Sequence, residues 1–184
     1  MFKTFASQAL SVLLLHVIIS YYVNNFSSPF TSKIMRALIQ RVSEASVIAD
    51  NTLTSQIKQG FLVLLGVEQL DQKDDAEWLA DKISQMRIFQ DEEDKMNLSL
   101  AQVDGDILVV SQFTLYASSK KGNRPSFIKA ARPEIAIPLY EYFNNYLGRL
   151  IGKEVKTGVF GADMKVSLIN DGPVTIWLDS KNKE

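Results

Sequence analysis

The chain has 184 residues, of which 46% are apolar and 22% are charged, and its formal net charge is −1. This length and composition are typical of one well-cored globular domain. There is no Cys, and the one His is His16 in an apolar N-terminal stretch. These counts exclude Cys-His and Ser-His-Asp nucleophilic sites, and thiolate or multi-histidine metal sites, from the remainder of the chain. No P-loop or G-x-G-x-x-G run is present either.

Residues 1–34 differ in composition from residues 35–184, because they contain no acidic residue and an apolar run at 9–23. That run is shorter than the roughly 20 residues that span a bilayer, so we expect no membrane anchor. A signal peptide is an alternative, although no small-x-small cleavage site comes after the run. We favour a functional start at Met35, where a strand pattern begins, and a single domain at 35–184.

That domain has 18 basic and 21 acidic side chains, a net charge of −3, so it lacks the globally basic character of many nucleic-acid-binding domains. The absence of Cys fits a reducing compartment, and we expect a cytoplasmic protein. The charge is uneven along the chain, because segment 118–132 contains five basic residues and no acid. Such a segment is either a solvated loop or a guide for a polyanion.

The first elements after Met35 read as strands. Apolar and polar residues alternate from Met35, and Asn51 marks a turn before TLTSQI, which predicts a hairpin. The continuously apolar run at 60–67 predicts a strand that is buried on both faces. Two acids, Asp74 and Asp75, then open a predicted helix with apolar residues at helical spacing.

The second half predicts a loop, a strand, a helix and two strands. The polar stretch at 91–100 reads as a loop, and 107–117 reads as a strand after a turn at Asp104-Gly105. A helix is predicted at about 134–151, with Pro138 in its first turn or at a kink. The last two strands, 164–170 and 173–179, are predicted to form a hairpin through Asp171-Gly172. This order indicates an α+β fold with a mixed or mainly antiparallel sheet and helices packed on it.

Two short motifs combine strand-like apolar residues with hydroxyl and amide side chains. In SQFTLYA at 111–117, strand alternation places Gln112 and Thr114 on one face, where they line a polar pocket or simply face water. In NDGPVT at 170–175, Gly172 and Pro173 form either a plain turn or a rigid element. A cis bond there directs two carbonyl oxygens the same way, which lets them measure the stereochemistry at a Cα.

The two motifs occur in an order that resembles a known family. MRALIQRV at 35–42, SQFTLYA, KGNRPSF at 121–127 and ADMKVSLINDGPVTIWL at 162–178 together resemble the D-aminoacyl-tRNA deacylase family of the bacterial and eukaryotic type. The motifs SQ-x-TL and N-x-GP-x-T are its signatures, and Ser111, Gln112 and Asn170 favour this type over the related animal-type deacylase. Asn123 departs from the family pattern, since a basic residue is common there.

The resemblance implies a barrel-like sheet with two main helices and a homodimer with active sites at the subunit interface. It implies that the Gly-Pro element of one subunit, in cis, inserts into the partner's pocket and is held by Arg41. The implied catalytic residues are Ser111, Gln112, Phe113 and Thr114; the substrate-binding residues are Arg41, Asn170, Gly172, Pro173 and Thr175; and the tRNA-binding residues are Lys120, Lys121 and Arg124. No metal or cofactor is implied.

The implied substrate is tRNA that carries a D-amino acid, or achiral glycine on tRNA(Ala), and the implied reaction is hydrolysis of its ester bond. An L-residue is excluded because its side chain meets the carbonyls of Gly172 and Pro173. Backbone N–H groups near Phe113 and Thr114 suit the oxyanion of an ester that is already activated. As general base we favour the 2′-hydroxyl of the terminal adenosine with an ordered water over Thr114 or Gln112, since Thr114 has no neighbouring base.

Two other functions fit the sequence. The first is a non-catalytic nucleic-acid-binding module that uses segment 118–132. The second is an editing domain of the synthetase-appended type, which hydrolyses a mischarged L-aminoacyl-tRNA.

Overall fold

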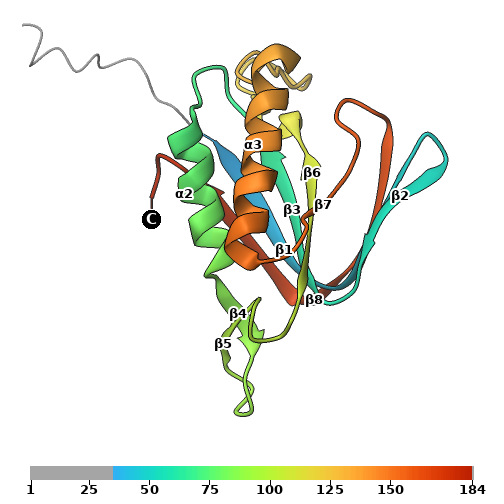
Figure 1. The fold of residues 1–184 in the computed structure, drawn as a ribbon. Coiled ribbons are helices and arrows are strands. Elements are labelled where there is room, and N and C mark those ends of the chain that lie inside the picture. Colours follow the sequence, from blue (N-terminus) through green and yellow to red (C-terminus); the bar gives the residue numbers. More distant parts are fainter. Residues whose placement is uncertain (1–34, 184) are drawn as a thin grey trace, which may run out of the picture. The chain divides into compact units, whose positions relative to one another are not determined.

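The computed structural model describes residues 35–183, so the apolar run at 9–23 lies outside the described residues. The elements succeed one another along the chain as shown in Figure 1. They are β1 (Arg36–Ala49), β2 (Thr52–Ile57), β3 (Gly60–Gly66), α2 (Lys73–Ser84), β4 (Arg87–Gln90), β5 (Met96–Ser99), β6 (Asp106–Ser111), the 3-10 turn η1 (Phe113–Tyr116), α3 (Pro133–Ile151), β7 (Lys156–Thr157) and β8 (Met164–Asp179). Neither helix in the described range is long and apolar enough to cross a membrane.

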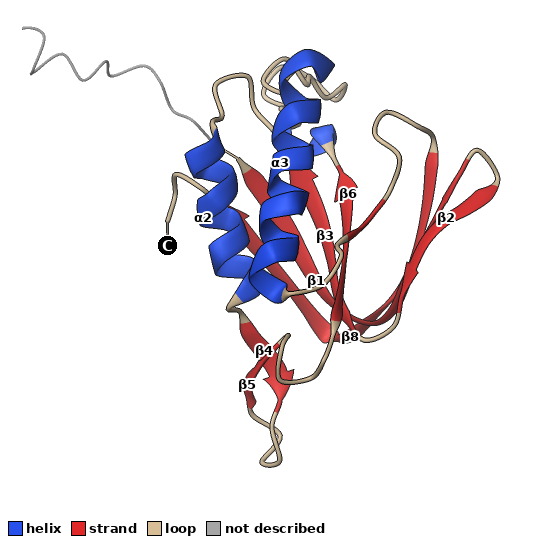
Figure 2. Cartoon of the chain, in the orientation of Figure 1, coloured by secondary structure: helices blue, strands red, loops and turns tan. Residues whose placement is uncertain are grey.

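Strand β1 organises a curled mixed sheet. Its first half pairs antiparallel with β3 on one edge and with the end of β8 on the other, and its second half lies between β2 and the start of β8. Strand β6 is parallel to β3, and β7 is parallel to β6. Ser55 on β2 donates a hydrogen bond to the carbonyl of Thr157 on β7 at 2.6 Å, so the outer edges of the sheet meet. The sheet is therefore nearly closed and barrel-like, which confirms the α+β fold with two helices (Figure 2).

The sheet separates two apolar cores, and β3 contributes to both. Phe61, Val63 and Leu65 face the core that α2 and α3 cover. Leu62 faces the second core, inside the curl of the sheet, with Val47 and other apolar residues of the neighbouring strands. This position explains why 60–66 is apolar without alternation and confirms the prediction of a strand buried on both faces.

Local sequence signals set the ends of the helices. The carboxylate of Asp75 accepts the backbone N–H of Gln72 at 2.9 Å and stabilises the start of α2. Helix α3 begins at Pro133, where a missing N–H has no cost, and ends at Gly152 with a left-handed φ of 68°. The helix predicted at 134–151 is confirmed. Pro138 lies inside α3 beyond the first turn, so of its two predicted placements the first turn is wrong, and the kink stays a prediction.

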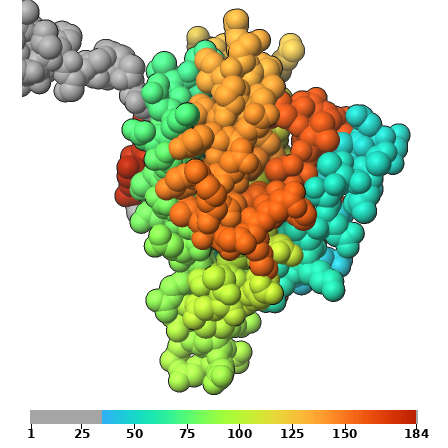
Figure 3. Space-filling view, viewed as in Figure 1, coloured from blue at the N-terminus to red at the C-terminus, as the bar shows by residue number. Residues whose placement is uncertain are grey.

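Stretch 91–100, which its polar composition predicted to be a loop, contains strand β5 instead. Strands β4 and β5 pair antiparallel and form a hairpin that projects from the rest of the domain (Figure 3). The Asp91 carboxylate accepts the backbone N–H groups of Glu93 and Lys95, so it closes the polar tip. Strands this short bury few side chains, and the usual apolar signal is absent.

The two final strands are one strand, and the predicted hairpin between them is wrong. Residues 164–170 and 175–179 of β8 both pair with β1. Val42 pairs with Asn170 and Gln40 with Thr175, so residues 171–174 bulge out opposite a single residue, Arg41. An Asp-Gly turn signal describes this local bend correctly, but pairing with a distant strand decides that the chain continues in the same direction.

Candidate active site

The SQFTLYA motif changes structure in its middle. Strand β6 ends at Ser111, the last residue that pairs with β3, and the backbone N–H of Gln112 still donates to the carbonyl of Leu65 at 2.7 Å. Residues 113–116 then form η1. The predicted strand at 107–117 is therefore wrong after Ser111. Gln112 and Thr114 are nevertheless adjacent, because the Gln112 amide donates to the Thr114 hydroxyl.

The turn exposes two backbone donors. Leu115 and Ala117 donate their N–H groups to the carbonyls of Gln112 and Thr114, at 3.3 and 3.0 Å. The N–H groups of Phe113 and Thr114 lie at the start of the turn, where no preceding turn offers an acceptor. Neither has a hydrogen-bond partner among residues 35–183. Two neighbouring free donors of this kind can stabilise an oxyanion.

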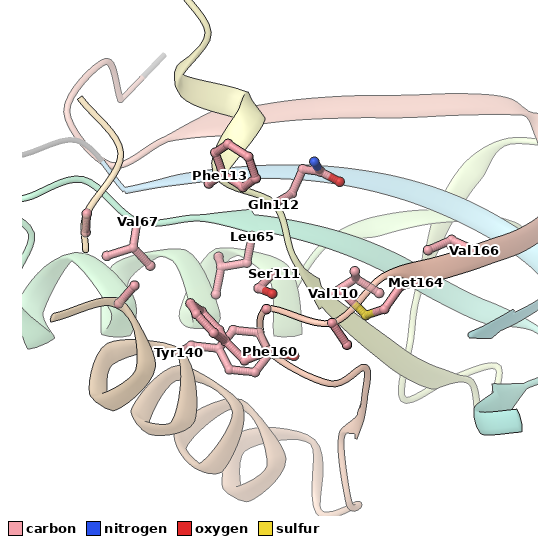
Figure 4. A pocket seen from close by; sticks show the side chains of 14 residues that line it. Leu65, Val67, Val110, Ser111, Gln112, Phe113, Tyr140, Phe160, Met164 and Val166 are labelled. Carbon is pink, nitrogen blue, oxygen red and sulfur yellow. The ribbon is translucent and has the colours of Figure 1, made fainter. Parts of the chain in front are cut away.

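A cavity of about 280 Å³ lies beside this turn. Ser111, Gln112 and Phe113 form one side of it (Figure 4). The remaining lining is mostly apolar and comes from β3, β6, α3, the start of β8 and the adjoining loops: Leu65, Val67, Val110, Ala131, Ala136, Tyr140, Phe160, Gly161, Ala162, Met164 and Val166. No carboxylate, amine or imidazole is among the lining side chains, so hydrolysis here depends on backbone donors, hydroxyls, amides or groups of the substrate.

Among the residues that line the cavity, Tyr140 has an ionisable side chain, and its role there is structural. Its hydroxyl donates to the carbonyl of Val109 at 2.8 Å, and its ring meets that of Phe160 edge to face. Burial raises the pKa of Tyr140 to about 12. The phenol is therefore neutral near pH 7 and cannot act as a general base.

Arg41 holds the bulge of β8. The residue is only 4% exposed, and its Nε donates to the carbonyl of Asp171 at 2.8 Å and lies 3.5 Å from the Asp171 carboxylate. One terminal nitrogen donates to the carbonyl of Ile88 on β4 at 2.6 Å. Arg41 thus ties the bulge to β1 and to the start of the hairpin.

Gly172 fits a position that other residues do not. Its φ is +142°, and an added Cβ would lie 2.7 Å from a methyl of Val174 and 3.0 Å from the Arg41 guanidinium. Both geometry and space therefore require glycine. The Gly172-Pro173 peptide bond is cis, and both residues are exposed.

Asn170 and Thr175 close the base of the bulge. The side-chain oxygen of Asn170 accepts the N–H of Val174 at 2.8 Å, and its amide donates to the Thr175 hydroxyl at 3.0 Å. The N-x-GP-x-T motif is therefore a structural unit, in which its polar side chains present Gly172 and Pro173 to solvent.

The two motifs lie far apart within one chain. Strand order places β8 three strands from β6, and Arg41 pairs with Phe61 while Ser111 pairs with Leu65, four residues further along β3. With about 4.8 Å between strands and about 3.3 Å per residue, the separation measured along the curled sheet is about 20 Å. Gly172 and Pro173 do not line the cavity beside Ser111.

Arg36 supports the turn, although no local pattern in the sequence indicated this role. Its guanidinium donates a hydrogen bond to the carbonyl of Leu115 at 2.9 Å and forms an ion pair with the Asp179 carboxylate at 3.2 Å. The same group lies 4.7 Å from the centre of the Tyr116 ring and 5.4 Å from that of the Trp177 ring. Arg36 therefore connects η1 to β8.

The sequence also did not indicate Tyr140 and Phe160 as cavity residues, because helix α3 and the loop before β8 come together there only in the folded chain.

The basic loop begins directly after η1. The side chains of Lys120, Lys121 and Arg124 are exposed, and none of them forms an ion pair within residues 35–183. Ser118 and Ser126 exchange two backbone hydrogen bonds, at 2.8 and 2.9 Å, so they close the base of the loop.

In the described part of the chain, no three His, Cys, Asp or Glu side chains gather in a way that could hold a metal ion.

Comparison with known proteins identifies the family. The family model described as D-Tyr-tRNA(Tyr) deacylase matches residues 38–179. A Flavobacterium johnsoniae protein named D-aminoacyl-tRNA deacylase is 61% identical over 150 residues, which cover 82% of this chain and 100% of the relative.

Two solved structures also match. One, titled c-Myc DNA Unwinding Element Binding Protein, is 40% identical with a TM-score of 0.73 over 78% of this chain and 97% of that chain. The other, titled as a probable eukaryotic D-amino acid tRNA deacylase, is 17% identical with a TM-score of 0.70 over 79% and 99% of the two chains, and shows a shared fold. From the family model and the Flavobacterium relative, the chain belongs to the D-Tyr-tRNA(Tyr) deacylase family.

Proposed function

We propose that this chain hydrolyses the ester bond of D-aminoacyl-tRNA and releases the free D-amino acid and tRNA. The observation that carries the proposal is the pair of free N–H groups at Phe113 and Thr114, beside a cavity without ionised side chains. An aminoacyl ester is already activated, so a site that positions it and stabilises the oxyanion is sufficient. Family membership and the name of the Flavobacterium relative support the same substrate.

In the proposed reaction, water adds to the ester carbonyl and the two N–H groups donate to the resulting oxyanion. The intermediate then collapses, the bond to the ribose 3′-oxygen breaks, and that oxygen takes up a proton. The 2′-hydroxyl of the terminal adenosine accepts the proton of the attacking water and gives its own proton to the departing 3′-oxygen, so it is a hydroxyl again at the end. Thr114 is a poor alternative base, because its hydroxyl oxygen accepts a bond from the neutral Gln112 amide and no titratable side chain contacts it.

We further propose that two copies of the chain complete each site. Gly172 and Pro173 are exposed, do not line the Ser111 cavity of their own chain, and lie about 20 Å from it along the sheet, which favours insertion into the cavity of a second molecule. Ile169 and Trp177, on either side of the bulge, are 54% and 46% exposed. Apolar side chains of this kind around a projecting element suit a subunit interface.

The inserted Gly172-Pro173 element sets the proposed chirality. Its backbone oxygens would occupy the space that an L side chain needs and leave room for hydrogen. Glycine and many D-residues are therefore accepted, including glycine mischarged on tRNA(Ala). We also propose that residues 35–184 suffice for activity, since the family match lies within them, and that the protein works in the cytoplasm, where translation uses charged tRNA.

The direct test compares deacylation of D-tyrosyl-, L-tyrosyl- and glycyl-tRNA by the purified protein. Hydrolysis of the D-tyrosyl and glycyl esters with little action on the L-tyrosyl ester is expected. Preferential hydrolysis of L-aminoacyl-tRNA would instead support the synthetase-type editing function. No release from any of the three would refute the proposal.

Subunit complementation tests the shared site. One variant carries Gln112→Ala with an intact bulge, and the other carries Arg41→Met with an intact turn. A mixed dimer has one site with both defects and one with neither, so mixing two weak variants should restore activity. Absence of recovery in a mixture that does form mixed dimers would show that each chain uses its own bulge.

A nucleic-acid-binding function without catalysis is the second candidate. The observation that favours it is the 40% identical structure whose title names a DNA-element-binding protein. Tight binding to duplex DNA, lost when Lys120, Lys121 and Arg124 are replaced and unaccompanied by ester hydrolysis, would support it over the deacylase.

A further inference from the structure

An aromatic pair of one exposed and one half-buried ring, Phe113 and Phe127, connects the turn η1 to the end of the basic loop. The Phe113 side chain is 58% exposed, and its ring meets that of Phe127 edge to face with centroids 5.1 Å apart. Next to them Ile128 is 91% exposed. Exposed large apolar side chains such as Phe113 and Ile128, next to a half-buried ring, commonly mark a binding surface.

The fold fixes the pair in place. Phe113 belongs to η1, and Phe127 lies between two backbone anchors of the loop. One anchor is the exchange of hydrogen bonds between Ser118 and Ser126, and the other is the bond from the N–H of Ala131 to the carbonyl of Val67 at 2.8 Å. The surface is therefore formed before any ligand arrives.

The charges next to the pair indicate the kind of ligand. Lys120, Lys121 and Arg124 are exposed, and no acid within residues 35–183 forms an ion pair with them. Cations in a loop that adjoins a partly exposed aromatic pair suit single-stranded nucleic acid, because phosphates meet the cations and any base can stack on a ring.

The position relative to the cavity indicates which nucleotide is bound. Phe113 lines the cavity with its own atoms, and its backbone N–H is one of the two proposed oxyanion donors. A terminal nucleotide whose ester reaches those donors therefore leaves the preceding, unpaired nucleotides close to the Phe113 and Phe127 rings.

We propose that Phe113 and Phe127 form a stacking platform for an unpaired base that precedes the terminal adenosine of tRNA, with Ile128 at its edge. The proposal rests on the proposed deacylase function and adds a base-binding surface outside the reacting centre. The platform binds without sequence preference, since every base has an aromatic face. It thereby orients the 3′ strand while the basic loop contacts phosphate.

The test uses two substrates and three variants. D-Tyrosyl-tRNA has the preceding nucleotides, whereas the D-tyrosyl ester of adenosine lacks them. Phe127→Ala should raise KM for the tRNA substrate about 5- to 150-fold, the range for loss of one stacked base, with little change in kcat. It should not affect the adenosine ester. Phe127→Trp should restore KM, and Leu53→Ala, at a 56% exposed position on β2, is the matched control.

Several outcomes would overturn the platform. An equal loss on both substrates would show that Phe127 only supports η1, and an unchanged KM for the tRNA would show that no base binds there. A shift of Phe127→Ala from dimer to monomer in sedimentation would assign the patch to a subunit interface.

A binding measurement separates this inference from the proposed function. Uncharged tRNA is compared with the same tRNA trimmed of its unpaired 3′ nucleotides. Phe127→Ala should weaken binding of intact tRNA toward the level of the trimmed form and should not affect the trimmed form. This result would support the platform even if no ester were hydrolysed, and equal binding of both forms by the unsubstituted chain would reject it.

Discussion

Replacing Arg41 should unfasten the bulge that presents Gly172 and Pro173. In Arg41→Met the apolar length of the side chain is kept, but the carbonyls of Asp171 and Ile88 lose their donors. The residue is 4% exposed, so water cannot easily replace the guanidinium. The expected consequences are a less stable domain and a misplaced bulge.

The magnitude is set by the two hydrogen bonds. Bonds that involve a charged group contribute about 1.5–3 kcal/mol each, so the pair contributes about 3–6 kcal/mol. Removing a buried guanidinium also removes its desolvation cost, which offsets part of the loss. We therefore expect the free energy of unfolding to fall by about 2–4 kcal/mol.

Arg87→Met is the matched control, measured with Arg41→Met by urea unfolding. Arg87 also donates two hydrogen bonds, both to Asn97, but it is exposed at the start of the β4-β5 hairpin. Because water can replace the hydrogen bonds of an exposed side chain, their loss should cost about 1 kcal/mol or less. Arg41→Met should also lower the rate on D-tyrosyl-tRNA and the preference over L-tyrosyl-tRNA, whereas Arg87→Met should change neither. Equal destabilisation by both variants, or an unchanged preference in Arg41→Met, would refute the assigned role of Arg41.

Three further outcomes are expected. Thr114→Val keeps the backbone N–H of residue 114, so the fall in kcat should be far smaller than the about 10⁶-fold loss that accompanies removal of a catalytic nucleophile; an aminoacyl-Thr114 adduct in mass spectrometry would contradict this. Deacylation should be unaffected by EDTA, and a loss that added metal reverses would count against the proposed chemistry. Burial raises the pKa of Glu68, so its contribution to stability falls as pH rises from its unfolded value of 4.5 through the raised folded value. Glu68→Gln should therefore raise Tm at pH 8 and not at pH 3, and equal shifts at both would show that another effect dominates.

The order of apolar, polar, Pro and Gly residues predicted correctly those helices and strands whose burial follows one rule from end to end. Strand β3 is apolar because each of its faces meets a core, and α3 has both its Pro at the start and its Gly at the end. The β1-β2 hairpin was also predicted correctly, since Asp50 and Asn51 adopt the positive φ values that such a turn needs. In these cases the residues that specify the element lie within it.

The candidate site departs from local pattern where distant contacts decide the structure. SQFTLYA alternates like a strand, yet the pairing of β6 with β3 ends at Ser111 and Leu65, and the chain closes into η1. The turn is supported by Arg36, which is 79 residues away from Leu115 in sequence. No local signal in either segment specifies that contact. The resemblance to the family therefore identified the two motifs but not Arg36, which supports one of them.

Both halves of the proposed site are fastened to β1, and this arrangement explains how two distant motifs can serve one reaction. Arg36 near the start of the strand holds η1 through Leu115, and Arg41 further along it holds the bulge through Asp171. The chain from Arg36 to Arg41 spans about 17 Å when extended. In a two-fold dimer, the bulge of one chain and the turn of the other must meet at the same distance on both sides, and that distance depends on the length of β1. In the proposed dimer, β1 would therefore set the geometry of both sites. A slip of two residues would keep every side chain on its face but would move the bulge by about 6.6 Å, away from the partner's N–H donors.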